Sequence, residues 1–304
     1  MHEGSKKAIA AAFLANLGIA VAKFIGFAVT RSSSMLAEGI HSVADTGNQG
    51  LLFLGGARAK RRADDTHPFG YARERYFWSF IVALVLFAVG GLFAVYEGYE
   101  KFRHPEHIDS PEWAFGILAV AIVLEMFSLR TAVREARPLK GPRSWWRFVR
   151  ESKTPELPVV LLEDLGALTG LALALCGVGM AVATDDGRWD ALGSISIGCL
   201  LVVIAVVLAN EMRSLLLGEG VDPATHEAMR RALADSDDVD RVIHLRTQHL
   251  GPDDVLVVAK VDFADDLAGD ELAGAVDAAE ERLRAVAPVA RLVFLEPDVY
   301  RDDT

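Results

Sequence analysis

Residues 36–49 read LAEGIHSVADTGNQ, and they lead directly into the apolar segment GLLFLGGA. Four polar side chains of this stretch, Glu38, His41, Asp45 and Gln49, are spaced by three, four and four residues. At about 3.6 residues per turn, this spacing places them on one arc of a helix surface. The stretch therefore predicts a helix with one ionisable face, joined without a break to a membrane-length apolar segment.

The composition of the whole chain favours an integral membrane protein. Of the 304 residues, 52% are hydrophobic, and the mean hydropathy is +0.26, above the usual value for a soluble globular domain. The segment from residue 222 onwards holds 20 acidic and 9 basic residues and so carries the whole net charge of −11. No basic domain is available to neutralise phosphates, which excludes nucleic acid as a partner.

Six segments are apolar and long enough to cross a lipid bilayer, since a spanning helix needs about 20 residues. They cover roughly residues 8–29, 34–57, 76–97, 112–133, 157–183 and 189–210. The first is predicted to be a retained span, because its apolar stretch is too long for a signal peptide and contains Asn16 and Lys23. Two loops, 58–75 and 130–153, hold six and eight Lys or Arg residues. Because basic loops stay in the cytoplasm, both chain ends are predicted to be cytoplasmic in a multi-pass protein of the inner cell membrane.

The shift in charge predicts a transmembrane domain over residues 1–210 and a small cytosolic domain over residues 211–304. In the second domain, Asp222 followed by Pro223 predicts the start of a helix. Two strand patterns around the turn LGPDD, a helical pattern and a last strand pattern follow. The order αββαβ predicts a small ferredoxin-like α+β domain with its helices on one face of the sheet.

Ionisable side chains within the bilayer cost several kcal/mol unless they are paired or hydrated, and they commonly mark ion or proton paths. His41 and Asp45, one helical turn apart, can hold one divalent cation from a single helix face. A tetrahedral site needs more ligands, and the fifth predicted span offers Glu163 and Asp164. Adjacent residues point about 100° apart on a helix. One of these two is therefore predicted to be a ligand, and the other a proton carrier or a contact between helices.

Three polar residues of other spans have less distinct roles. Asn16 and Lys23 are seven residues apart and share one face of the first span. They could pair with the spare carboxylate of the fifth span, or Lys23 could extend to the membrane interface. Glu125 in the fourth span is assigned to packing.

Three stretches of the sequence together resemble the cation diffusion facilitator family. They are SSSMLAEGIHSVADTGNQ, DDTHPFGYARERYFWSFI, and LLGEGVDP before the αββαβ pattern. The fifth-span sequence LLED is similar to the branch that includes the mitochondrial zinc transporter of animals. The resemblance implies a six-span homodimer, without a cofactor, that exports a divalent metal, usually zinc, against protons. It assigns the transport site to His41, Asp45 and Asp164.

The sequence departs from the family pattern at several positions. The family commonly has HxxxD in the fifth span, but Val160 stands where the histidine would be, so either Glu163 or water completes the shell. A second family site would fall on Asp64 and His67, but Tyr71 replaces its usual third ligand, a histidine. This predicts a weak second site; a hydrogen bond of His67 that anchors the loop is an equally good interpretation. The C-terminal domain has few histidines, which indicates a metal-poor dimerisation domain.

Two other classes of function compete with transport. An intramembrane metal-dependent hydrolase would use its metal to activate water, but no HExxH or comparable motif is present in the sequence. A passive channel needs weak binding at several sites, whereas buried His and carboxylate ligands bind tightly and titrate. One imidazole and several carboxylates fit zinc, and such an oxygen-rich set also accepts manganese, iron or cobalt. The sequence therefore predicts a transporter and not an enzyme.

Overall fold

A computed structural model of the chain describes residues 3–30, 33–105 and 111–301. Within these ranges, the side chains of residues 3, 26, 27, 29, 30, 33–41, 44 and 111 lie outside the described part. The chain separates into two compact units. The helical unit comprises residues 1–61 and 74–213, and the small unit comprises residues 62–73 and 214–304. The loop 62–73 thus groups with the C-terminal part of the chain.

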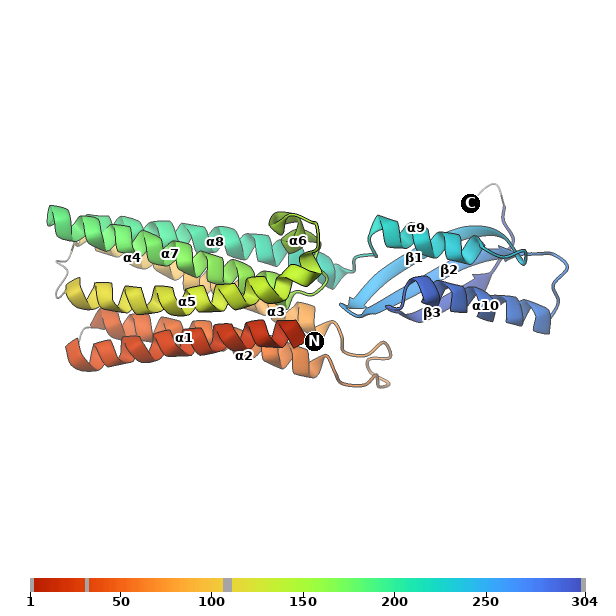
Figure 1. Cartoon of the computed structure of the whole chain (residues 1–304), viewed down its shortest axis with the longest axis horizontal. Coiled ribbons are helices and arrows are strands. Elements are labelled where there is room, and N and C mark those ends of the chain that lie inside the picture. Colours follow the sequence, from red (N-terminus) through yellow and green to blue (C-terminus); the bar gives the residue numbers. More distant parts are fainter. Residues whose placement is uncertain (1–2, 31–32, 106–110, 302–304) are drawn as a thin grey trace. The chain divides into compact units, whose positions relative to one another are not determined.

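Long helices run side by side through the helical unit (Figure 1). The third span is a continuous rod in which a π-helical segment, η1, joins two α-helices. The elements are α1 (Glu3–Thr30), α2 (Ser33–Arg58), α3 (Glu74–Val85), η1 (Leu86–Leu92), α4 (Phe93–Arg103), α5 (Pro111–Lys140), α6 (Trp145–Glu151), α7 (Glu156–Thr184) and α8 (Arg188–Leu217).

Five helices in the described part of the chain are long and apolar enough to cross a membrane: α1, the α3–α4 rod, α5, α7 and α8. The second predicted segment also forms a helix, α2, but it contains the polar stretch 36–49 and is not among the five. Three of the described helices extend six or seven residues beyond the predicted ends of their spans, since α4 continues to Arg103, α5 to Lys140 and α8 to Leu217. Hydropathy marks only the apolar part of a helix, whereas Arg, Glu and Leu continue it with good helix propensity.

Glycines let α8 approach the η1–α4 segment closely. A Cβ atom at Gly98 would lie 2.8 Å from the backbone nitrogen of Ile195, and one at Gly198 would lie 2.7 Å from that of Val95. Small residues allow such backbone contact between membrane helices, where van der Waals packing drives association. The two helices therefore pack backbone to backbone.

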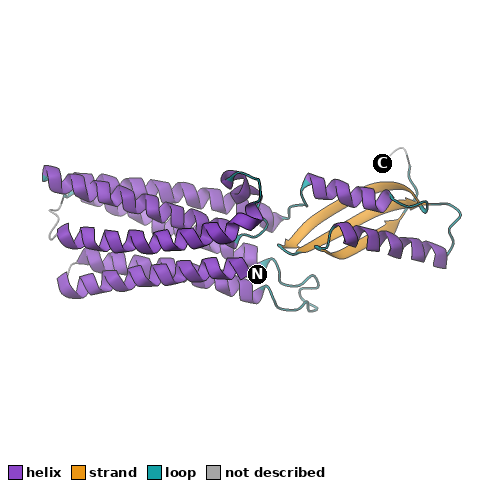
Figure 2. Cartoon of the chain, in the orientation of Figure 1, coloured by secondary structure: helices purple, strands orange, loops and turns teal. Residues whose placement is uncertain are grey.

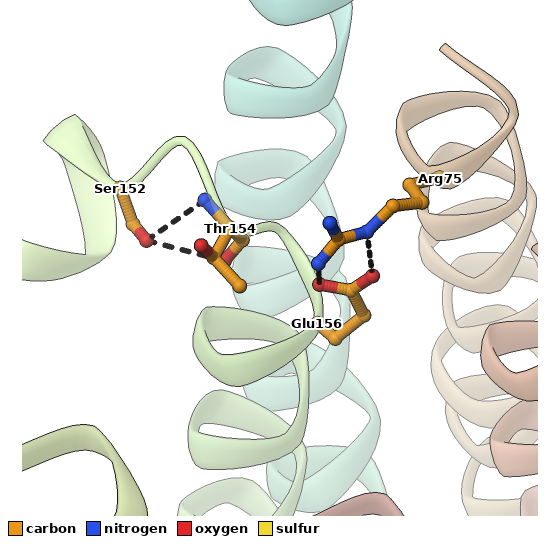
Figure 3. A network of polar contacts seen from close by, with 4 residues as sticks. All are labelled: Arg75, Ser152, Thr154 and Glu156. Atoms are coloured by element: carbon orange, nitrogen blue, oxygen red, sulfur yellow. Dashed lines mark hydrogen bonds and ion pairs between the residues drawn. The ribbon is translucent and has the colours of Figure 1, made fainter. Parts of the chain in front are cut away.

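A buried ion pair joins the first turns of α3 and α7 (Figure 3). Arg75 donates from Nε to Oε1 of Glu156 at 2.5 Å and from Nη2 to Oε2 at 2.8 Å. Their side chains are only 4% and 2% exposed. Beside this pair, the hydroxyl of Ser152 bonds the backbone of Thr154 and shapes the turn that leads into α7. A bidentate guanidinium–carboxylate pair fixes both distance and orientation, so it ties these two helix ends together.

The small unit has the predicted order of helices and strands, with both helices on one face of the sheet (Figure 2). Within β2, Val255, Val257, Ala259 and Val261 are buried and alternate with more accessible residues, as expected for a sheet covered on one face. Strand β2 lies in the middle, antiparallel to β1 and parallel to β3. The elements are α9 (Pro223–Ala234), β1 (Val239–Gly251), β2 (Asp254–Phe263), α10 (Asp270–Val286) and β3 (Ala290–Pro297).

Asp222 caps α9 as the sequence predicts. Its Oδ1 accepts hydrogen bonds from the backbone N–H groups of Ala224 and Thr225, both at 3.1 Å, and Oδ2 accepts the Thr225 hydroxyl at 2.6 Å. The Thr225 hydroxyl and then these N–H groups hold the pKa of the Asp222 carboxyl below its usual value. Donors that favour the charged form have this effect.

Candidate metal-binding site

Helix α2 contributes the first predicted ligands of the intramembrane site. His41 belongs to this helix, but its side chain lies outside the described residues. Asp45, one turn later, is half-buried and interacts electrostatically with Glu163 of α7 and Glu125 of α5. The polar face of α2 therefore meets acidic side chains from two other helices.

Glu163 is 7% exposed and is held by two side-chain amides of α2. Gln49 Nε2 donates to its Oε2 at 3.0 Å, and Asn48 Nδ2 donates to its Oε1 at 3.4 Å. Both amides are almost completely buried. These contacts connect α2 and α7 beside Asp45.

Asp164 is bonded to a different helix from its neighbour. It is 2% exposed, and its Oδ2 accepts a hydrogen bond from the hydroxyl of Ser128 in α5 at 2.7 Å. The divergence of Glu163 towards α2 and Asp164 towards α5 agrees with the angle between adjacent residues on a helix. The two carboxylates consequently approach the space between the helices from different directions.

Glu125 is a member of this acidic group that the sequence analysis assigned to packing. It is 4% exposed and lies on α5, one turn before Ser128. Its electrostatic partners are Asp164, Asp45 and Lys23 of α1. The signal that revealed Glu163 and Asp164, an acid within an apolar run, was also present at Glu125, but nothing in the sequence showed which way it faces.

The arrangement gathers four carboxylates from three helices, with one lysine of a fourth helix near Glu125. Such an excess of negative charge in a bundle of apolar helices favours a cation or protons as its counter-charge. Within the described side chains, which do not include that of His41, no three His, Cys, Asp or Glu residues are close enough to hold a metal ion. The described residues therefore form an acidic cluster between helices, and the set of metal ligands stays a prediction.

Residues 9–217 match the family model described as the cation efflux transmembrane domain. This match covers more than two thirds of the chain. The chain belongs to the cation efflux family.

Three relatives illustrate the similarity. The chain is 35% identical over 244 residues to the human mitochondrial proton-coupled zinc antiporter SLC30A9, an overlap of 79% of this chain and 43% of the relative. It is 28% identical over 263 residues to metal tolerance protein C4 of Arabidopsis thaliana, covering 85% of this chain and 57% of the relative. Identity to magnetosome protein MamB of Magnetospira sp. is 24% over 285 residues, with 90% and 91% covered. The chain therefore spans about half the length of the first two relatives.

In this cation efflux protein, Asp64 and His67 belong to the exposed loop 62–73. Asp64 Oδ1 accepts hydrogen bonds from the backbone N–H groups of Thr66 at 3.1 Å and His67 at 2.8 Å, and Oδ2 accepts the Tyr71 hydroxyl at 2.7 Å. The Tyr71 hydroxyl and then the His67 N–H hold the pKa of the Asp64 carboxyl below its usual value. The His67 ring nitrogen Nδ1 is 3.7 Å from Oδ1. Tyr71, which stands in place of a histidine ligand, thus organises the loop around Asp64.

Two histidines of the small unit lie within hydrogen-bond distance of backbone carbonyls. His226 Nε2 lies 3.2 Å from the carbonyl oxygen of Leu245, and His249 Nδ1 lies 3.2 Å from that of Gly251. His244 is exposed on β1. These contacts hold the ring of His226 against strand β1 and the ring of His249 at the end of that strand.

Proposed function

We propose that this protein exports a divalent metal cation, zinc in the first instance, in exchange for protons. The observation that carries the proposal is the group of carboxylates, buried on α5 and α7 and half-buried on α2, within a bundle of apolar helices. A relative is named a proton-coupled zinc antiporter, which favours zinc over manganese, iron or cobalt. Catalysis is not part of the proposal, and an intramembrane hydrolase is the alternative that the experiment below tests.

The proposed metal ligands are His41, Asp45 and Asp164, with Glu163 as the additional carboxylate. An imidazole and carboxylates from two helices suit a zinc ion. These ligands bind metal when deprotonated, so metal entry releases protons and proton entry releases metal. Exchange follows if the site opens first to one side of the membrane and then to the other.

The proposed architecture has six spans, with α2 as the second and least hydrophobic of them. Its 26 residues give a length of about 39 Å, enough to cross the hydrocarbon core. Asn48 and Gln49 of this helix are buried against Glu163 of α7, so these polar side chains avoid the cost of exposure to lipid. An even number of spans, with basic loops inside, gives cytoplasmic N- and C-termini in an inner cell membrane.

The proposed domains are a transmembrane domain, residues 1–210, and a cytosolic ferredoxin-like domain, residues 211–304. Helix α8 continues through this boundary, which marks the end of the apolar span and the start of the acidic segment. The cytosolic domain would support a homodimer. Asp64 and His67 would be the ligands of a second metal site. Because this site has only two protein ligands, we expect it to bind metal weakly.

Flux into proteoliposomes tests the proposal. Zinc uptake is measured with and without a pH gradient, for the unaltered chain and for Asp45→Ala and Asp164→Ala. We expect gradient-dependent zinc flux that each substitution abolishes while the protein stays folded. A hydrolase would give no flux, and a channel would give flux indifferent to the pH gradient. Faster manganese than zinc flux in competition would overturn the choice of metal.

A further inference from the structure

The hydroxyl of Ser128 does not bond to its own helix. In membrane helices, Ser and Thr hydroxyls commonly donate to the carbonyl four residues earlier. Six other hydroxyls in the described helices do so, among them Thr131 on the next turn of α5, which donates to the carbonyl of Phe127 at 3.0 Å. Ser128 instead donates across the helix interface to Oδ2 of Asp164 at 2.7 Å.

Both partners of this bond are buried, with Ser128 at 0% and Asp164 at 2% exposure. A hydroxyl has one proton to donate, and here it goes to one named oxygen of a carboxylate. This fixes the rotation of the Asp164 side chain and keeps the lone pairs of the other oxygen, Oδ1, for a cation. At 2.7 Å the bond has the usual length of a well-formed O–H···O hydrogen bond.

The donors to both α7 carboxylates of the site are neutral. Asp164 accepts from a serine hydroxyl, and Glu163 accepts from the amides of Asn48 and Gln49. The carboxylate of Glu156 at the end of the same helix is instead held by the guanidinium of Arg75. A cationic partner neutralises a carboxylate and competes with a metal, whereas a neutral donor orients it and leaves its charge available.

We propose that Ser128 is a positioning residue that orients Asp164 for metal binding. The inference rests on the proposed function, because it assigns a role in the same site. Hydrogen-bonding partners of metal ligands fix ligand orientation, and their loss typically lowers metal affinity or activity by about 10- to 100-fold. Loss of the Ser128 hydroxyl therefore weakens zinc binding, while the carboxylate that carries the charge is retained.

Zinc-dependent uptake by full-length protein in proteoliposomes, at a fixed pH gradient, tests this role. For Ser128→Ala we expect the KM for zinc to rise by about 10- to 100-fold, with the maximal rate retained. Ser128→Thr restores the hydroxyl and should restore the KM. Thr131→Ala removes a hydroxyl one turn away that bonds its own helix, so it serves as the matched control with an unchanged KM.

A structural tie between α5 and α7 would give a different pattern. It would lower the thermal stability and the maximal rate of Ser128→Ala and leave the KM unchanged. If Ser128→Ala does not fold, Ser128→Cys keeps a side chain of similar shape with a weaker donor, and its KM should be raised. A KM in either variant equal to that of Thr131→Ala, or a Ser128→Thr variant as impaired as Ser128→Ala, overturns the proposal.

Asp164→Ala separates this inference from the proposed function. Retained zinc transport in Asp164→Ala would show that the proposed metal site is wrong. An inactive Asp164→Ala variant together with a normal KM in Ser128→Ala would refute only the positioning role of Ser128 and leave the proposed site in place.

Discussion

Substitution of one partner in the Arg75–Glu156 ion pair should strongly destabilise the helical unit. The change is Glu156→Gln, which keeps the size of the side chain and removes its negative charge. The guanidinium of Arg75 is 4% exposed, so it would be left as a buried cation. Removing one partner of a buried pair costs about 3–5 kcal/mol. Coulomb's law gives a similar value of about 4 kcal/mol for unit charges roughly 4 Å apart at an effective dielectric constant of about 20.

The free energy of unfolding in mixed detergent and SDS micelles measures this cost. Glu151→Gln is the matched control, because Glu151 pairs with Arg147 at 2.7 Å but the two side chains are 44% and 66% exposed. Exposed pairs contribute about 0.2–1 kcal/mol. The two substitutions are chemically identical and differ in burial, so the difference between them reports the cost of a buried charge.

Removal of both charges of the ion pair should cost less stability than removal of one. Arg75→Met combined with Glu156→Met should recover most of the stability lost by Glu156→Gln, since apolar replacement of a buried pair is often neutral or stabilising. The reasoning is refuted if Glu156→Gln costs no more than Glu151→Gln. It is equally refuted if the double variant is less stable than Glu156→Gln.

Three further predictions concern the site and the C-terminal segment. Glu163→Gln removes one titratable carboxyl group, and the transport rate of the variant, measured across external pH, should be lower and less dependent on pH; an unchanged pH profile contradicts a role of Glu163 as a metal ligand. The isolated segment 211–304 should sediment as a dimer with or without chelator, and a dimer lost on chelation would reveal a metal site there. In that segment, Asp222→Ala should cost about 1 kcal/mol in thermal unfolding at neutral pH. Because the folded pKa of Asp222 is lowered, its contribution is present above the unfolded pKa of about 3.9 and is lost as pH falls through the folded pKa; a difference constant with pH contradicts this.

The sequence predicted the elements of the fold because their signals are local. Apolar runs identified the long helices, and the alternation in residues 255–261 together with the Asp222 cap identified the small sheet domain. The grouping of loop 62–73 with the C-terminal part was not predictable, because it depends on contacts between distant segments. The helix ends at Lys140 and Leu217 were not predicted, because the hydropathy falls several residues before each helix ends.

Some residues of the candidate site could likewise be predicted from the sequence, and others could not. Glu163 and Asp164 could be identified because they are charged residues within an apolar run, and Asp45 because it lies one helical turn from His41 on a polar helix face. Ser128 and Asn48 could not, since small neutral polar residues are common in membrane helices. Their role depends on which face of one helix meets a carboxylate of another, and that is a property of the packed bundle.

The charge of the site and the packing of the helices are physically linked. Asp45, Glu125 and Asp164 come from three different helices, so a shift of any one helix changes the separation of like charges in a medium that screens them poorly. With no cation bound, repulsion favours wider separation or protonation; with a divalent cation bound, the same groups are drawn together. If the proposed site binds a divalent cation, its occupancy would therefore bias the arrangement of α2 and α5 against α7. Neutral donors such as Ser128 and Gln49 can persist in both states, because they orient a carboxylate without supplying the counter-charge. A site built in this way can exchange metal for protons by changing which of the two cancels its negative charge.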